Sequence, residues 1–125
     1  MKPMTVTGCV LALVLFGLSG AEGADWVVVA ETDNSVTWVD KQSIRRSPGG
    51  MVRAWVRLEQ KDPSTSVKEM DAYNDFDCTR AKWRGLGLTI YYRNGTSASA
   101  PQEQSWTHIT PGTVEKAVFD YLCRK

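Results

Sequence analysis

The chain contains one histidine, His108, which is the first residue to consider for chemistry. Histidine is the side chain that most often transfers protons near neutral pH. A hydrolase could combine His108 with Ser105 as nucleophile and one of several carboxylates, but nothing in the spacing positions these groups. A small hydrolase using His108 is therefore kept as an alternative hypothesis, and no catalytic residue is assigned.

A second candidate group, Asp71, Asp75 and Asp77, resembles a carboxylate cluster for calcium. Alternate residues of a strand share one face but lie about 6–7 Å apart, which is too spread for one ion. The cysteines offer no Cys–His zinc spacing. Gly85-Leu86-Gly87 lies inside a strand pattern, where glycines mark a bulge or close packing and not a phosphate-binding loop. The sequence predicts no metal site and no cofactor.

Cys78 and Cys123 are the two cysteines that remain once an N-terminal export signal is removed. Outside the cytosol two such thiols are expected to oxidise to a disulfide. Cys78 lies on the apolar side of a strand pattern, and Cys123 adjoins the apolar stripe of the last helix pattern. Both thiols therefore belong to one core, and we predict a Cys78–Cys123 disulfide.

The export signal itself covers Met1–Ala24, with cleavage expected between residues 21 and 24. Its apolar run, Cys9–Leu18, is far shorter than the roughly 20 residues of a transmembrane span. No small-residue lipobox precedes Cys9, so we expect no lipoprotein. Residues 25–125 then form one domain, periplasmic or secreted to the cell surface.

Charge excludes one class of partner. The net charge is +1, and it stays so after cleavage because the signal removes one basic and one acidic residue. A balanced chain gives no support to nucleic-acid binding.

Strand patterns dominate the mature chain. Three long ones alternate apolar and polar residues: Val52–Gln60, Val67–Cys78 and Lys82–Tyr92. Asn94-Gly95 predicts a type I′ hairpin turn, and Thr96–Gln104 predicts a long loop or a frayed edge strand. Shorter strands are expected at Trp26–Thr32, Val36–Asp40 and Ser105–Ile109.

One helix pattern closes the chain. Pro111 suits a first helical position, Thr110 or Thr113 can cap, and the apolar stripe is Val114, Ala117, Val118, Tyr121 and Leu122. The predicted fold class is α+β: an antiparallel sheet of five or six strands, with the C-terminal helix packed on one face and held by one disulfide.

A single helix leaves the other side of the sheet to water or to a partner. Alternation places six aromatic and basic residues there: Arg53, Trp55, Arg57, Tyr73, Trp83 and Tyr91. Asp71, Asp75 and Asp77 can pair with the arginines across strands. Aromatic residues and arginine carry binding energy in protein interfaces, so these six residues are the candidate binding surface. The alternative interpretation is a solvated face whose aromatic residues only shield the sheet.

The order of several short motifs resembles the bacterial surface-adhesin protein E family. The motifs are Trp38-Val39-Asp40 with Ser43-Ile44, Val52-Arg53-Ala54-Trp55, Asp77-Cys78 with Arg80 and Arg84, Trp106 with Ile109–Thr113, and Cys123. The resemblance spans essentially the whole mature chain. It implies a small α+β domain exported from a Gram-negative cell, with an internal disulfide, no enzymatic activity, protein or extracellular-matrix ligands, and a homodimer as an option.

Three hypotheses follow. The first is a non-catalytic exported binding module, adhesin-like, that recognises a protein or an extracellular-matrix component. The second is a periplasmic envelope or assembly component that acts through self-association. The third is the hydrolase that uses His108.

Overall fold

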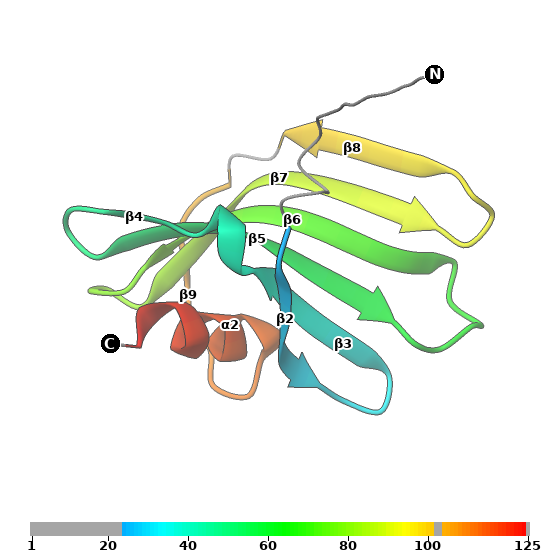
Figure 1. Cartoon of the computed structure of the whole chain (residues 1–125), viewed down its shortest axis with the longest axis horizontal. Helices are drawn as coiled ribbons and strands as arrows, with labels where there is room; N and C mark the ends of the chain where they lie inside the picture. The colour runs from blue at the N-terminus through cyan, green and yellow to red at the C-terminus, as the bar shows by residue number, and fades with distance from the viewer. Residues whose placement is uncertain (1–23, 102–103, 125) are drawn as a thin grey trace, which may run out of the picture.

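The computed structural model describes residues 24–101 and 104–124, which form an antiparallel sheet with a helix on one face (Figure 1). Six strands follow one path: β2 (Trp26–Glu31), β3 (Ser35–Asp40), β5 (Met51–Gln60), β6 (Val67–Asp77), β7 (Lys82–Tyr92) and β8 (Ser97–Pro101). Two short strands lie beside it, β4 (Arg45–Ser47) against β5 and β9 (Thr107–His108) against β7. The predicted fold class is confirmed, with eight strands in the sheet instead of five or six.

The pairing of β5 with β6 follows from their alternating patterns. Val52 lies opposite Phe76, and both side chains are buried. The next pair, Arg53 opposite Asp75, points to the other side of the sheet. The long hairpin therefore separates an apolar face from a polar and aromatic face along its whole length.

A β-bulge in β7 changes one of these assignments. Tyr73 pairs with Gly87 but Asn74 pairs with Gly85, so Leu86 is an extra residue in the strand. The extra residue reverses the alternation before it, and Trp83 lies opposite Phe76, packed against the core. The bulge, which is one of the two predicted roles of the glycines, is confirmed, whereas the prediction of Trp83 on the uncovered side is wrong.

The loops show two further differences. Of Asn94 and Gly95, Gly95 alone has a positive φ (91°), and its N–H donates to the Tyr92 carbonyl at 3.1 Å. This is a type I turn followed by a glycine bulge, so the type I′ prediction is wrong. The segment that follows is an exposed edge strand, β8, which is one of the two predicted options.

The helix α2 (Val114–Cys123) begins after Thr113, whose hydroxyl accepts a hydrogen bond from the Lys116 N–H at 3.2 Å. Pro111 lies in the turn before it and not in the first helical position. The stripe buries Val118 and Leu122, which are 2% and 0% exposed. They pack on apolar residues of the sheet: Val39, Val52, Ala54, Val56 and Phe76.

The predicted disulfide is present. Cys78 follows the end of β6, Cys123 ends α2, and their Cα atoms are 5.5 Å apart. The bridge ties the last helical turn to the sheet. In Figure 1, α2 lies under one end of the sheet, beside β2.

The predicted signal peptide lies outside the described residues, except for Ala24. In the part of the chain that the structure describes, no helix has the length and hydrophobicity that a membrane span requires.

We expect Cys78→Ser to lower the free energy of unfolding by about 2–5 kcal/mol, because the bridge restricts the unfolded chain and fixes α2 on a small core. Urea unfolding followed by tryptophan fluorescence measures the loss. Reductant should destabilise the wild type by a similar amount and leave Cys78→Ser unchanged. Equal midpoints for the two proteins would contradict a stabilising bridge.

Candidate functional site

The side of the sheet away from α2 is the candidate functional site, and we call it the open face. It consists of side chains from three central strands: Arg53, Trp55 and Arg57 of β5, Asp71, Tyr73 and Asp75 of β6, and Arg84 and Tyr91 of β7. Direct pairing arranges them in cross-strand rows, with a pair of aromatic residues between two rows of ion pairs.

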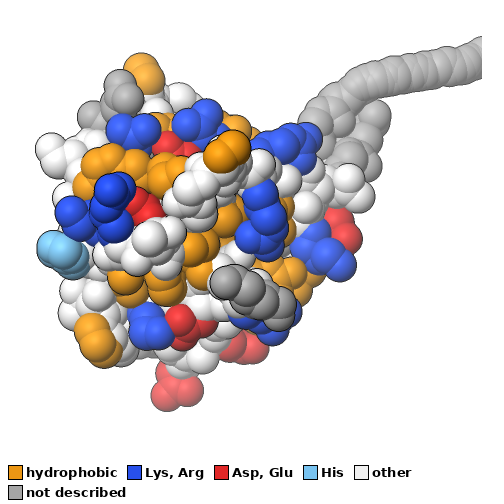
Figure 2. Space-filling view, turned by 90° about the vertical axis from the view of Figure 1, so that its left-hand side faces the viewer, with side chains coloured by type: hydrophobic (Ala, Val, Ile, Leu, Met, Phe, Trp, Pro, Cys, Tyr) orange, Lys and Arg blue, Asp and Glu red, His pale blue; other side chains and the backbone are white. Residues whose placement is uncertain are grey.

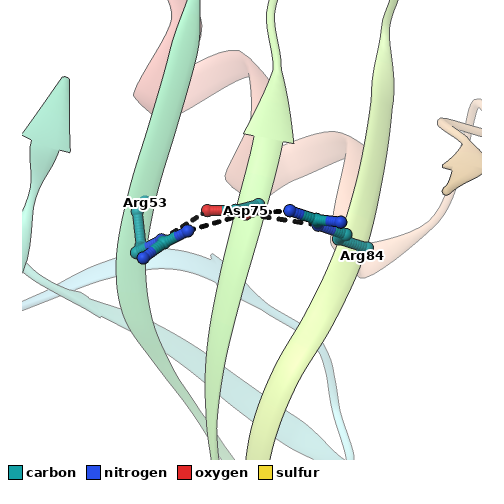
Figure 3. Close-up of polar contacts among 3 residues, drawn as sticks. All are labelled: Arg53, Asp75 and Arg84. Carbon is teal, nitrogen blue, oxygen red and sulfur yellow. Dashed lines mark hydrogen bonds and ion pairs between the residues drawn. The ribbon is translucent and has the colours of Figure 1, made fainter. Parts of the chain in front are cut away.

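The first row joins three strands through one carboxylate (Figure 3). Arg53 donates to both oxygens of Asp75 at 2.6 and 3.1 Å. Arg84 donates to Asp75 Oδ2 from the other side, at 3.2 and 3.3 Å. Asp75 is only 3% exposed. Burial acts to raise the pKa of Asp75, but the hydrogen bonds from the two guanidinium groups outweigh it, and this pKa lies below its ordinary value.

The middle row is aromatic. The rings of Trp55 and Tyr73 lie with centroids 4.9 Å apart and planes tilted by 30°, within the range of attractive aromatic pairs. The guanidinium of Arg53 lies 5.7 Å from the centre of the Tyr73 ring. The Trp55 ring is therefore packed against Tyr73, while 37% of the residue remains exposed.

The second ionic row centres on Arg57. Its Nε lies 2.9 Å from both Asp71 Oδ1 and Glu69 Oε2, and its guanidinium stacks 4.0 Å from the centre of the Trp26 ring. Burial and the neighbouring Asp71 raise the pKa of Glu69 despite the attraction of Arg57. Glu69 therefore favours folding when protonated, and that contribution is lost as pH rises through the raised pKa.

The middle row and the Arg57 row border a hollow of about 580 Å³ on the open face. Its aromatic lining comes from Trp26, Trp55 and Tyr91, and its polar lining includes Arg57 and Asp71. Tyr91 is 39% exposed, similar to Trp55. An aromatic wall with few fixed polar groups is the usual composition of a binding site, so the hollow can hold an apolar or planar group and orient it by hydrogen bonds.

The structure brings together five of the six predicted binding residues. Four lie in the rows, and Tyr91 lies at the end of the hollow. The sixth, Trp83, lies on the helix side, for the reason given above. Sequence reasoning missed Trp26, although it starts a predicted strand. Trp26 pairs with Asp40, the last residue of β3, and both residues line the hollow.

A larger hollow lies at the end of the molecule where the disulfide is found. It measures about 670 Å³, and its lining includes Cys78, Cys123, Arg46 and Arg124 but no aromatic residue. Figure 2 looks onto this end and shows hydrophobic side chains interspersed with Lys and Arg. The aromatic anchors that dominate interface energetics are therefore on the open face and not here.

The candidate chemistry of His108 has no support in the geometry. His108 lies exposed in β9, opposite Lys82, and within residues 24–101 and 104–124 its side chain has no hydrogen bond to a serine or a carboxylate. Among the same residues, no three His, Cys, Asp or Glu side chains come close enough to hold a metal ion.

Comparison with known proteins gives one family. The model of the surface-adhesin protein E family matches residues 26–124. Two solved structures of Haemophilus influenzae protein E share the fold. The first, crystal form II, has a TM-score of 0.58 at 14% identity, covering 78% of this chain and 86% of that chain. The second has a TM-score of 0.57 at 14% identity, covering 78% and 83%. No curated protein sequence matches this chain.

We expect Asp75→Asn to lower the free energy of unfolding by about 1–3 kcal/mol near pH 7. This is less than for a fully buried pair, because the Arg53 side chain is 44% exposed. Since the pKa of Asp75 is lowered by folding, its contribution is present above about pH 4 and is lost as pH falls through the lowered pKa.

Urea unfolding of the wild type and Asp75→Asn between pH 2 and pH 7 tests this. The matched control is Asp120→Asn, which removes an exposed pair with Lys116 on α2 and should change stability little. A gap between wild type and Asp75→Asn that stays constant down to the lowest pH would refute the role of the carboxylate.

Proposed function

Because this chain belongs to the surface-adhesin protein E family, we propose that it is an adhesin-like, non-catalytic binding module that recognises a protein or an extracellular-matrix component through its open face. The observation that carries this proposal is the 580 Å³ hollow, where two of the most exposed large hydrophobic residues, Trp55 and Tyr91, lie with the Arg57–Asp71 ion pair.

The energetics of such a surface suit protein recognition. Tryptophan, tyrosine and arginine are the residues most enriched among those whose truncation weakens interfaces. Trp55 and Arg57 already have neighbours that restrict their rotamers, Tyr73 for the first and Asp71 for the second. A partner therefore has less side-chain entropy to remove on binding.

The proposal includes the compartment. Cleavage of the signal in residues 1–24 would leave an exported domain without a lipid anchor, either secreted to the cell surface of a Gram-negative bacterium or retained in the periplasm. The disulfide fits an oxidising compartment of either kind.

One observation favours the second hypothesis, an envelope component that self-associates. The edge strand β8, Ser97–Pro101, is exposed throughout and has no charged side chain. Charged residues are a common protection against edge-to-edge pairing. A homodimer through this edge would leave the open face accessible, whereas a homodimer through the open face would cover it.

We expect the double variant Trp55→Ser, Tyr91→Ser to abolish binding to the recognised component while the domain still unfolds cooperatively. Its thermal midpoint should fall by about 4–8 °C, because the loss of the Trp55–Tyr73 ring contact costs about 1 kcal/mol. Biolayer interferometry against purified serum and extracellular-matrix proteins measures binding, and calorimetry measures stability.

The control is Val28→Ser, which removes the third exposed large hydrophobic residue, 45% exposed and outside the hollow. It should bind as the wild type does. Trp83→Ser should instead lose stability, because Trp83 packs on the core. Unchanged binding by the double variant would exclude the open face as the recognition surface.

We expect intact cells treated with protease to lose the protein if it is displayed, while a periplasmic marker stays intact. Immunoblotting of fractions from the native cell measures this. Full protection until the outer membrane is opened would contradict surface display and favour the envelope hypothesis, for which light scattering across micromolar concentrations then tests for a dimer.

A further inference from the structure

The helix side of the sheet holds a third hollow, which the proposed function does not use. It measures about 230 Å³ and lies beyond the first turn of α2. Its floor is apolar, formed by Leu58 and Met70 with Leu88, and Trp83 and Val114 border it. We call it the helix-side groove. It exists because α2 is ten residues long and covers one end of an eight-stranded sheet.

A buried amide lies in this groove. Asn74 is 7% exposed and lines the groove from β6. Among the described residues no protein group hydrogen-bonds to its carboxamide, but its polar atoms are not fully excluded from solvent, so water in the groove solvates them. A ligand that displaces this water must replace its hydrogen bonds or lose affinity. The carboxamide therefore favours a ligand that brings its own hydrogen-bond donor and acceptor.

A glycine keeps the space in front of this amide open. A Cβ at Gly85 would lie 3.0 Å from Gln104 Oε1 and 3.7 Å from Asn74 Oδ1. Gln104 is held there by its N–H, which donates to the Gly85 carbonyl at 3.0 Å. Two carboxamides thus converge over a position without a side chain. Each can donate and accept, which matches the N–H and C=O of a peptide unit.

The charged residues of the groove lining restrict the class of ligand further. The groove lining contains one carboxylate, Glu115, and no lysine or arginine. An anionic head group would enter a site with nothing to pair with it and would meet a like charge. A neutral group would lose less solvation there. The lining therefore disfavours fatty acids and phosphate-bearing lipids.

We infer that the helix-side groove binds an aliphatic side chain of a partner polypeptide together with its neutral peptide unit. The side chain enters between Leu88, Trp83 and Val114, and the peptide unit hydrogen-bonds to Asn74 and Gln104. The volume of 230 Å³ suits one such side chain and its peptide unit, because it is below the roughly 300–1,000 Å³ of sites for larger ligands. The groove and the open face lie on opposite sides of the sheet, so one protein can bind at both.

The test uses three small probes and the purified protein with its disulfide intact. N-acetyl-leucine amide carries the aliphatic group and neutral peptide units, N-acetyl-leucine replaces the terminal amide with a carboxylate, and octanoate carries an acyl chain with a carboxylate. Titrations followed by ¹H–¹⁵N spectra should show the amide probe shifting the Asn74 side-chain and Trp83 indole signals. It should bind about tenfold more tightly than either anion.

Two variants locate the site. Gly85→Ala places a methyl group against Gln104 and Asn74 and should weaken the amide probe about tenfold. The matched control is Gly87→Ala. Gly87 also borders the groove, but it pairs with Tyr73, so its Cβ would point to the open face, where it meets nothing within 4 Å. This variant should bind as the wild type does. The open-face double variant Trp55→Ser, Tyr91→Ser should also bind the probe normally, which separates this inference from the proposed function.

Several results would overturn the inference. Octanoate binding more tightly than the amide would assign the groove to acyl chains. Signals of Asn74 and Trp83 that move with protein concentration alone would assign it to a second copy of the chain. No shift with the amide probe, or equal affinity in Gly85→Ala and Gly87→Ala, would leave the groove without a peptide-binding role.

Discussion

The antiparallel pairing of β5 with β6 is the constraint on which the rest of the structure depends. Its register runs without a shift from Met51 opposite Asp77 to Glu59 opposite Glu69. A slip of β5 by one residue would turn Val52 to the open face and place Arg53 in the core. The buried apolar side and the cross-strand ion pairs favour the same register. The open face and the core are therefore two consequences of one hydrogen-bonded ladder.

The small core explains the position of the helix and its bridge. Two buried residues of α2, Val118 and Leu122, complete a cluster that the sheet begins, and a domain of this size buries a modest share of its surface. The Cys78–Cys123 bridge holds the last turn of the helix, together with a hydrogen bond from the Arg46 side chain to the Leu122 carbonyl at 2.8 Å. The short helix that this arrangement allows cannot cover the whole sheet, which leaves Leu58 and Met70 beside the helix-side groove.

Sequence reasoning predicts what depends on local periodicity. Alternation assigned the faces of β5 and β6, and the helix pattern placed the buried stripe and the disulfide partner. The prediction of side-chain faces failed at β7, because the bulge adds one residue to the strand and so exchanges the two faces before it. Glycines carry no side chain, so the sequence pattern does not show where this exchange occurs. Trp83 was misplaced for this reason. Trp26 was missed because its place in the hollow depends on the path of β2 and β3, which is non-local.

The alternation of ionic and aromatic rows on the open face also restricts the rotamers of the exposed aromatic side chains. An exposed tryptophan without packed neighbours would sample several rotamers, and fixing one of them on binding would cost conformational entropy. Here Trp55 lies against Tyr73, and the Arg53–Asp75 and Arg57–Asp71 pairs of the neighbouring rows flank both rings. Each guanidinium is held by two hydrogen bonds to its carboxylate. The charges thus act mainly as a rigid frame for the rings, and they keep an exposed aromatic surface solvated.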